Sequence, residues 1–170
     1  YVRLYPLLDF STSLDQRFDV AYRLGAIFLS EGYPGGPGRP DQALQLLEKG
    51  RRYEPDQWQF AHDMGFVYYW WLRDFSAAAA HFEEAARLPG APLWLRTMAA
   101  VTLAKGGDRD AARQLWTQLL DGSDVDWIKR SAAFHLQQIR ALDDLDALTG
   151  LIERFAVRAG PMMAGGAMFD

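Results

Sequence analysis

The chain has no cysteine among its 170 residues. This excludes disulfide frameworks, cysteine zinc clusters and thiol catalysis, and leaves both a reducing cytoplasm and an oxidising cell envelope open as locations. An excess of basic residues is also lacking: the chain has 18 lysines and arginines and 22 acidic residues, which gives a net charge of −4. Such a balance gives no basic face for phosphates, so we expect no nucleic-acid partner. The longest apolar run, residues 66–72, is far below the roughly 20 residues that cross a bilayer, so we expect no membrane span.

Apolar and aromatic residues are plentiful. They make up 49% and 14% of the chain, enough to bury a substantial core. The most informative feature is an internal repeat: residues 94–103 read WLRTMAAVTL and residues 127–136 read WIKRSAAFHL, 33 positions further on. A self-match at this spacing is typical of helical repeats, in which each unit buries its apolar face only by stacking on its neighbours.

Helical spacing of apolar residues, interrupted by glycine and proline, predicts about four antiparallel helix pairs over residues 18–158. Residues 1–17 read as the remnant of a preceding repeat helix. The breaks fall at 32–40, at Pro55, at Pro89-Gly90 and at 106–108, where Asp108 is expected to cap the next helix. We expect the fourth pair to comprise a helix around Trp127 and a second helix over roughly 143–158, with its leucines on one side.

These residues resemble the tetratricopeptide repeat family, whose first helix carries Leu-Gly-x-x-Tyr and whose second carries Ala-x-x-x-Phe before a closing proline. The matching positions are Leu24-Gly25 with Phe28, Ala43 with Leu47, Pro55, Met64-Gly65 with Tyr68, Ala78 with Phe82, and Ala112 with Trp116. The resemblance covers residues 18–155. It implies an all-α fold, a right-handed α-solenoid of stacked antiparallel helix pairs. Alanine replaces the glycine in the last two units, and Ala21 and Ala61 stand where the family often has tryptophan.

The resemblance also implies a binding wall, because the first helices of such pairs line a concave surface. The positions expected on it are Tyr22, His62, Phe66, Tyr69, Trp70, Trp94, Thr97, Trp127, Arg130 and Phe134. Aromatic side chains dominate this wall, and each buried ring can contribute about 1.5–3 kcal/mol. We expect the wall to bind a segment of another protein. Packing of the rings between adjacent repeats stays open as the alternative, above all for Trp94 and Trp127.

The sequence shows no residues with the spacing of a catalytic or metal site. His62, His81 and His135 lie on different units, without a second ligand three or four residues away. The 32–40 segment follows a helix and lacks the Gly-Lys-Ser/Thr ending of a phosphate loop, so it reads as an exposed turn or a partner-contacting finger. We therefore expect no enzyme activity, no metal and no cofactor.

The predicted function is a non-catalytic scaffold or assembly factor that binds a protein partner through an aromatic-rich concave groove. The alternative is a constitutive structural subunit of a large membrane-associated complex. Residues 159–170 are rich in glycine and methionine and are expected to form a flexible tail, either free or ordered on a partner. The chain reads as a fragment, so a targeting segment or anchor is expected, if present, upstream of Tyr1. Between the cytoplasm and the cell envelope, the resemblance to bacterial repeat proteins attached to the envelope favours the envelope.

Overall fold

The computed structural model describes residues 1–159, and this part of the chain is all-helical, without strands. The helices are α1 (Leu4–Leu14), α2 (Asp19–Ser30), α3 (Pro40–Tyr53), α4 (Trp58–Val67), α5 (Phe75–Arg87), α6 (Trp94–Lys105), α7 (Arg109–Gly122) and α8 (Asp126–Ala159), with a π-helical turn η1 (Tyr68–Leu72) continuing α4. The all-α prediction is confirmed. The predicted tail, residues 159–170, lies almost entirely outside the described residues.

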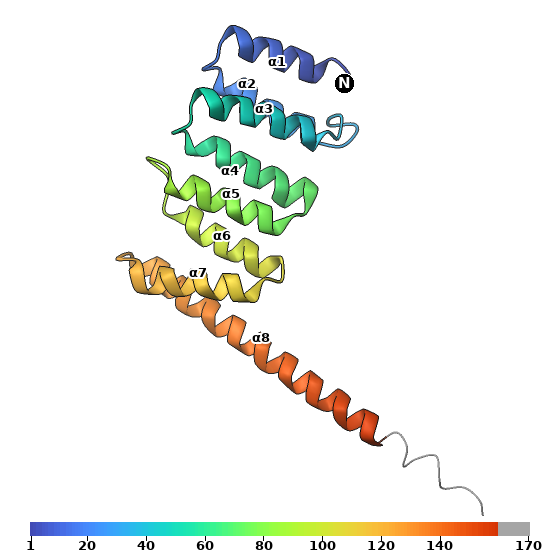
Figure 1. Cartoon of the computed structure of the whole chain (residues 1–170), viewed down its shortest axis with the longest axis vertical. Coiled ribbons are helices and arrows are strands. Elements are labelled where there is room, and N and C mark those ends of the chain that lie inside the picture. The colour runs from blue at the N-terminus through green and yellow to red at the C-terminus, as the bar shows by residue number, and fades with distance from the viewer. Residues whose placement is uncertain (160–170) are drawn as a thin grey trace, which may run out of the picture.

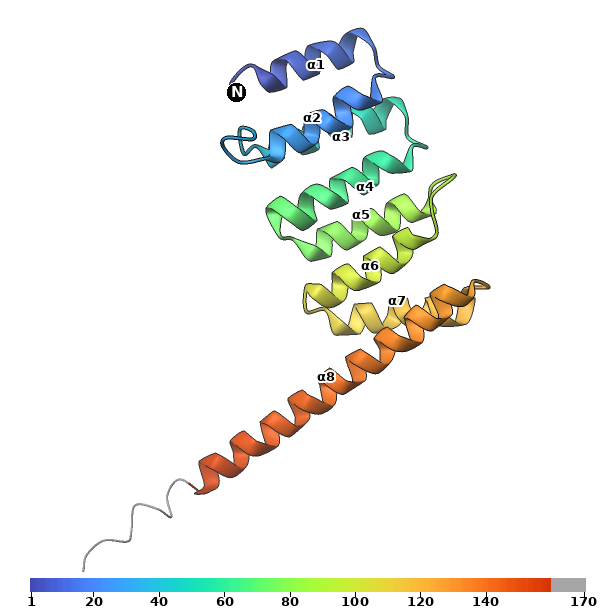
Figure 2. The same ribbon diagram turned by 180° about the vertical axis from the view of Figure 1, so that it is seen from behind.

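Helices α1 to α7 follow one another along the long axis of the molecule (Figure 1). The connections alternate between the two sides of this row, so consecutive helices are antiparallel (Figures 1 and 2). Each helix packs mainly on the helices next to it in sequence. Packing of this kind spreads the core along the row instead of concentrating it at one centre.

Local signals place the helix starts. The Asp74 and Asp108 side chains accept hydrogen bonds from the amides of Ala77 and Ala111, at 2.9 and 3.0 Å, and so cap α5 and α7. The predicted capping role of Asp108 is confirmed. Pro40 occupies the first turn of α3, where its missing amide proton costs nothing.

Small residues allow the paired helices to approach closely. A Cβ atom placed on Gly65 of α4 would lie 2.6 Å from the ring of Phe82 in α5, so only glycine fits beside this fully buried ring. The motif glycine of the second unit is therefore explained by packing. Buried residues from α4 to α8 form one apolar cluster around Phe82 and Trp116, and a second cluster around Tyr22 and Phe60 joins α2, α3 and α4.

The predicted fourth helix pair is wrong. Instead of turning back, α8 runs without interruption for 34 residues, from Asp126 to Ala159. The described part thus holds three pairs (α2 with α3, α4 with α5, α6 with α7), flanked by α1 and α8. Residues 137–142 are good helix formers without glycine or proline, and nothing in them stops the helix. The first part of α8 packs on α7, and its last part projects beyond the row (Figures 1 and 2).

Residues 1–17 form α1 and its connection to α2. Lys49 of α3 ties this helix to the row, because its ammonium group donates hydrogen bonds of 2.7 Å to the backbone carbonyl and the carboxylate of Asp9. Tyr22 of α2 adds a further bond from its hydroxyl to the Thr12 carbonyl at 3.2 Å. These residues therefore form a helix that packs on α2 and α3.

Candidate functional site

Tryptophans lie at the starts of α4, α6 and α8. Trp58 and Trp94 begin α4 and α6, and Trp127 is the second residue of α8. The rings of Trp58 and Trp94 meet edge to face, with centroids 6.3 Å apart. Our sequence analysis missed Trp58, although its position at the start of a first helix, equivalent to Trp94, was a readable signal.

The aromatic contacts continue along α4 into η1 and α5. His62 lies 5.9 Å from Trp58 and 5.7 Å from Trp94, measured between ring centroids. The remaining neighbour distances are 6.2 Å for His62–Phe66, 6.0 Å for Phe66–Trp70, 5.3 Å for Trp70–Tyr69 and 5.4 Å for Tyr69–Phe75. We call these residues the aromatic row: Trp94, Trp58, His62, Phe66, Trp70, Tyr69 and Phe75. Each ring pair contributes about 0.5–1.5 kcal/mol beyond the area it buries.

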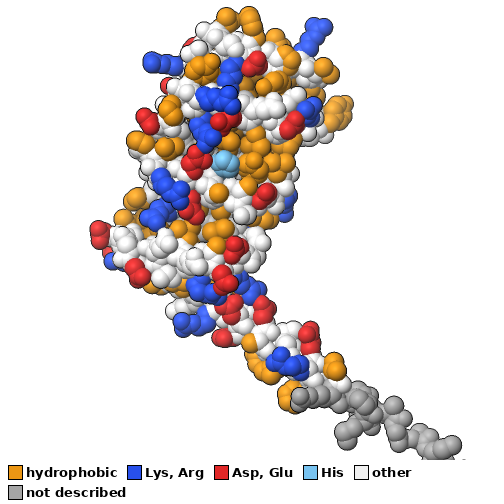
Figure 3. Space-filling model, in the orientation of Figure 1, with side chains coloured by type: hydrophobic (Ala, Val, Ile, Leu, Met, Phe, Trp, Pro, Cys, Tyr) orange, Lys and Arg blue, Asp and Glu red, His pale blue; other side chains and the backbone are white. Residues whose placement is uncertain are grey.

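The aromatic row has a packed base and an accessible top. The His62 side chain is only 18% exposed, while Trp70 and Trp94 are 52% and 41% exposed. The rings of Trp70 and Trp94 can therefore contact a partner without a change in the packing of the core. On the face shown in Figure 3, hydrophobic side chains gather over the middle helices and are interleaved with charged groups.

Charged side chains border the aromatic row. At one side Asp63 accepts a hydrogen bond of 2.5 Å from Nε of Arg23, and it lies 2.8 Å from Nδ1 of His62. The bond to Asp63 raises the pKa of the Arg23 guanidinium, which keeps that group charged. At the other side the Lys105 ammonium donates a 2.6 Å hydrogen bond to the Tyr69 hydroxyl and lies 4.5 Å from the ring centroid, a cation–π contact.

The structure brings together five of the ten predicted wall residues: His62, Phe66, Tyr69, Trp70 and Trp94 all belong to the aromatic row. Thr97 lies one turn after Trp94 on α6, half-buried, with its hydroxyl bonded to the Trp94 carbonyl at 2.7 Å. Trp127, Arg130 and Phe134 are exposed on α8. The ring of Trp94 packs on two other rings, as the packing alternative expects, and it still leaves a large face accessible.

The prediction that Tyr22 faces a partner is wrong. Its side chain is fully buried, meets the ring of Phe60 edge to face at 5.6 Å, and donates its hydroxyl proton to the Thr12 carbonyl. Burial raises the pKa of this phenol. The sequence pattern could not exclude Tyr22 from the wall, because the covering helix α1 lies in the residues that were interpreted only as a remnant.

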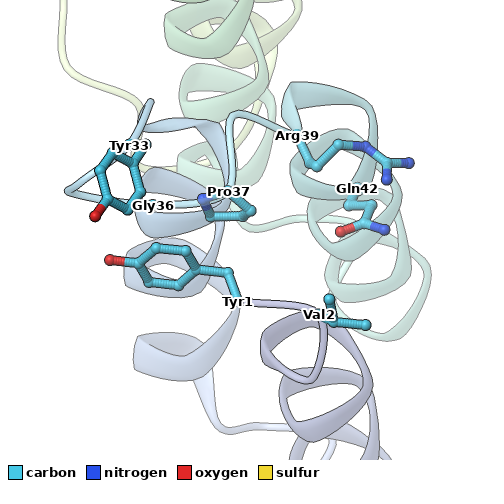
Figure 4. A pocket seen from close by; sticks show the side chains of 7 residues that line it. All are labelled: Tyr1, Val2, Tyr33, Gly36, Pro37, Arg39 and Gln42. Atoms are coloured by element: carbon cyan, nitrogen blue, oxygen red, sulfur yellow. The ribbon is translucent and has the colours of Figure 1, made fainter.

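A cavity of about 410 Å³, separate from the aromatic row, lies beside the 32–40 segment (Figure 4). The rings of Tyr1 and Tyr33 lie on one side of it and the side chains of Arg39 and Gln42 on the other. The amides of Gly36 and Gly38 are used in hydrogen bonds to nearby backbone carbonyls. Gly36 donates to the Gly32 carbonyl at 3.1 Å and Gly38 to the Glu31 carbonyl at 2.6 Å. A phosphate cradle needs free amides, so the geometry speaks against one.

Among residues 1–159, no group of three or more histidine and carboxylate side chains is placed to hold a metal ion. Within the same residues, no helix combines the length and the apolar content that crossing a bilayer requires. Comparisons of the chain with protein-family models, with curated proteins and with solved structures found no match.

Proposed function

We propose that the chain is a tetratricopeptide-like α-solenoid that acts as a non-catalytic scaffold, binding a segment of another protein against the aromatic row. The observation that carries the proposal is the row itself, seven neighbouring aromatic or histidine side chains on consecutive helices. It is supported by the accessible rings of Trp70 and Trp94.

The repeat architecture is supported by two independent features. The sequence repeats with a 33-residue offset at 94–103 and 127–136, and each helix packs mainly on its neighbours in sequence. Stacked repeats of this kind expose a long surface made by equivalent helices. The first helices of the second and third pairs, α4 and α6, both contribute to the aromatic row, as this architecture requires.

The binding role is supported by the chemistry of the aromatic row. Tryptophan, tyrosine and arginine are the residues at which the binding free energy of protein interfaces concentrates, and a polar border around apolar rings is the usual arrangement of such interfaces. Here Arg23 with Asp63 and Lys105 supply that border. The chemistry fits a protein segment that inserts apolar side chains between the rings and hydrogen-bonds at the edges.

The test is an affinity capture from the native cell lysate with three forms of the chain. The first is the wild type, the second is Phe66→Ala/Trp70→Ala, and the third is the control Tyr53→Ala, which removes a half-exposed ring at the end of a second helix. We expect the control to retain the proteins captured by the wild type and the double variant to lose them while it stays folded, with a melting temperature lowered by the ring contacts that it loses. A folded double variant that captures the same proteins would reduce the aromatic row to a feature of the core.

The alternative function, a constitutive subunit of a membrane-associated complex, makes a different prediction about the isolated chain. A scaffold that exchanges partners is stable when purified alone, whereas an obligate subunit loses its native state without its neighbours. Size-exclusion chromatography of the isolated chain separates the two: a defined, reversible species supports the scaffold, and aggregation supports the subunit.

A further inference from the structure

Positive charge gathers on the helices that carry the aromatic row and on the start of α8. Residues 58–73, 94–105 and 126–142 span α4 with η1, α6 and the start of α8, and they contain six basic and two acidic residues. The rest of the chain contains 12 basic and 20 acidic residues. These three segments therefore carry a net positive charge within a chain whose net charge is −4.

The basic side chains of these segments differ in their partners from those of the second helices. Every lysine and arginine of α3, α5 and α7 forms an ion pair within 4 Å. Within residues 1–157, whose side chains the structure describes, no acidic group lies within 4 Å of any basic side chain of the three segments. These basic residues are Arg73, Arg96, Lys105, Lys129, Arg130 and Arg140. An exposed cation of this kind is available to an anionic group of another molecule.

Two of these cations meet at one end of the aromatic row. The Lys105 ammonium lies 4.5 Å from the ring centroid of Tyr69 and 5.7 Å from that of Phe75. The guanidinium carbon of Arg73 lies 5.5 Å from the same Phe75 centroid. We call Arg73 and Lys105 the cation pair. It lies close to the exposed ring of Trp70, because the ring of Tyr69 contacts those of both Trp70 and Phe75.

The cation pair has hydrogen-bond donors to offer. The Lys105 ammonium has three donors and gives one of them to the Tyr69 hydroxyl. The acidic residues nearest to the pair in sequence are Asp74 and Asp108, and their side chains cap α5 and α7 instead. A carboxylate has two oxygens, so it can accept hydrogen bonds from an ammonium and a guanidinium at the same time. The cation pair therefore has the chemistry of a carboxylate site.

The backbone at Arg73 supports a role for its side chain. Arg73 ends η1 in the left-handed conformation, with a φ of 57°, and it is the only non-glycine residue with a positive φ within residues 1–159. Glycine or asparagine is the usual residue at such a position, because a larger side chain strains it. Backbone strain of this kind is concentrated at ligand-binding positions.

We propose that the aromatic row binds an acidic segment of a partner protein, in which a side-chain carboxylate stands close to large apolar residues. The inference rests on the binding function proposed above and adds the chemistry of the partner. The carboxylate binds to the cation pair, and the apolar side chains contact the accessible rings of Trp70 and Trp94. A purely apolar segment would cover the cation pair without giving it an acceptor, which costs binding free energy.

A nucleic acid fits this surface less well than an acidic protein segment. Aromatic rings that bind bases offer open faces for stacking. Here the ring of Tyr69 meets those of Trp70 and Phe75 edge to face, at interplanar angles of 72° and 79°. A long phosphate backbone would also extend beyond the cation pair over an acidic molecule. The observations therefore favour a short segment with few charges.

The first test is a selection from a phage-display library of random linear peptides on the immobilised full chain. We expect the enriched peptides to carry aspartate or glutamate close to large apolar residues. The enrichment should be lost on Arg73→Gln/Lys105→Gln and retained on the control Lys129→Gln/Arg140→Gln. This control removes two equally exposed cations from the other side of α8, about 200° and 220° around the axis from Trp127 at about 100° per residue.

The second test measures the affinity of a labelled peptide from this selection by fluorescence anisotropy. Arg73→Gln/Lys105→Gln should weaken binding at least about fivefold, and the control less than about twofold. Lys105→Arg keeps the charge and should retain most of the affinity. Raising NaCl from about 0.05 to 0.5 M should weaken the wild type far more than the double variant. Arg73→Glu/Lys105→Glu should prefer the same peptide with lysine in place of its acidic residues. Circular dichroism checks that each variant is folded.

Three results would overturn the proposal and leave the function of the aromatic row in place. Selected peptides without acidic residues, bound equally by the wild type and Arg73→Gln/Lys105→Gln, would show that the partner is purely apolar. Equal losses in the two double variants would show unspecific attraction to positive charge. Tighter binding of single-stranded oligothymidylate than of any selected peptide, lost in Arg73→Gln/Lys105→Gln, would assign the cation pair to phosphates.

A different result separates the proposed function from this inference. A selection that enriches no peptide, or peptides that Phe66→Ala/Trp70→Ala binds as tightly as the wild type, would contradict both, because the aromatic row would then bind no protein segment.

Discussion

Two segments of similar sequence have different surroundings in this molecule. Residues 94–103 form most of α6, and residues 127–136 form the start of α8. Both begin with a tryptophan of similar exposure, 41% for Trp94 and 45% for Trp127. Both bury the next residue, Leu95 or Ile128. They differ further along, because Ala100 and Leu103 are buried while Ala133 and Leu136 stay partly exposed.

The cause lies in the residues that follow. After α6 the chain reads Gly106-Gly107-Asp108, where Gly107 adopts a φ of +87° and Asp108 caps α7. The chain turns, and α7 returns over Ala100 and Leu103. At the equivalent place α8 has Ile139-Arg140-Ala141, and the helix continues. Turn residues, and not the repeat motif, therefore decide whether a first helix receives its own partner helix.

The largest effect is expected where α7 and α8 join. Trp116 is almost fully buried, and its ring stacks on that of His135 with centroids 4.5 Å apart. Trp116→Ala should lower the free energy of unfolding by about 3–5 kcal/mol, because it leaves a large cavity between the two helices. Urea unfolding measures the loss, and Trp127→Ala, at a half-exposed ring, should cost about 1 kcal/mol or less. Equal costs for the two variants would mean that α8 is not docked on α7 as described.

A matched pair of substitutions sharpens the comparison between the two copies. Ala100→Leu places a larger side chain between α6 and α7 and should cost about 1–3 kcal/mol by overpacking. Ala133→Leu makes the same change where no helix follows, and it should alter stability by no more than about 0.5 kcal/mol. Thermal unfolding of the two variants checks this. If Ala133→Leu were as costly, a covering helix would have to lie beside α8 after all.

A smaller and local effect tests why α8 continues. Arg140→Gly introduces glycine at the position equivalent to Gly107, and it should weaken α8 locally by about 1 kcal/mol relative to Arg140→Ala. Hydrogen exchange should then become faster in residues 142–157 and stay unchanged in α1 to α6. Faster exchange throughout the chain would show instead that the projecting part of α8 unfolds together with the preceding helices as one unit.

The smallest effect concerns two carboxyl groups at the junction of α2, α3 and α4. Oδ1 of Asp19 and Oε2 of Glu54 are both buried, and burial, together with the neighbouring Asp19, raises the pKa of Glu54. An acid whose pKa is raised by folding costs stability as the pH rises through that value. Glu54→Gln should therefore raise the melting temperature at pH 7 and leave it unchanged near pH 4. An equal gain at both pH values would assign the effect to packing.

The sequence predicted much of this architecture, and its failures have physical causes. Glycine and proline breaks located the turns after α2, α3, α5 and α6, because these residues stop helices locally. The turn between η1 and α5, at Arg73 and Asp74, contains neither residue. The continuity of α8 was missed because the spacing of Leu145, Leu148 and Ile152 fits a covered second helix as well as an uncovered stripe. Helical periodicity shows which residues share a side, but not whether anything packs on that side.

The same property of helical periodicity explains why only part of the aromatic site was predicted. Five wall residues come together because they share α4, η1 and the start of α6, where sequence spacing fixes their neighbours. Tyr22 has the same spacing but lies under α1, and this cover depends on a contact between helices that spacing does not encode. Trp58 was recognisable only after the helix starts were aligned with each other.

The most direct measurement of the difference between the two copies is a distance along α8. Spin labels on cysteines introduced at Lys129 and Val157, both exposed, can be measured by double electron–electron resonance in the otherwise cysteine-free chain, diluted with unlabelled protein so that only distances within one molecule count. A continuous helix predicts about 42 Å between the two backbone positions, from 28 residues at 1.5 Å each. A helix pair like α6 and α7 would bring the labels within roughly 20 Å, and that result would contradict the account.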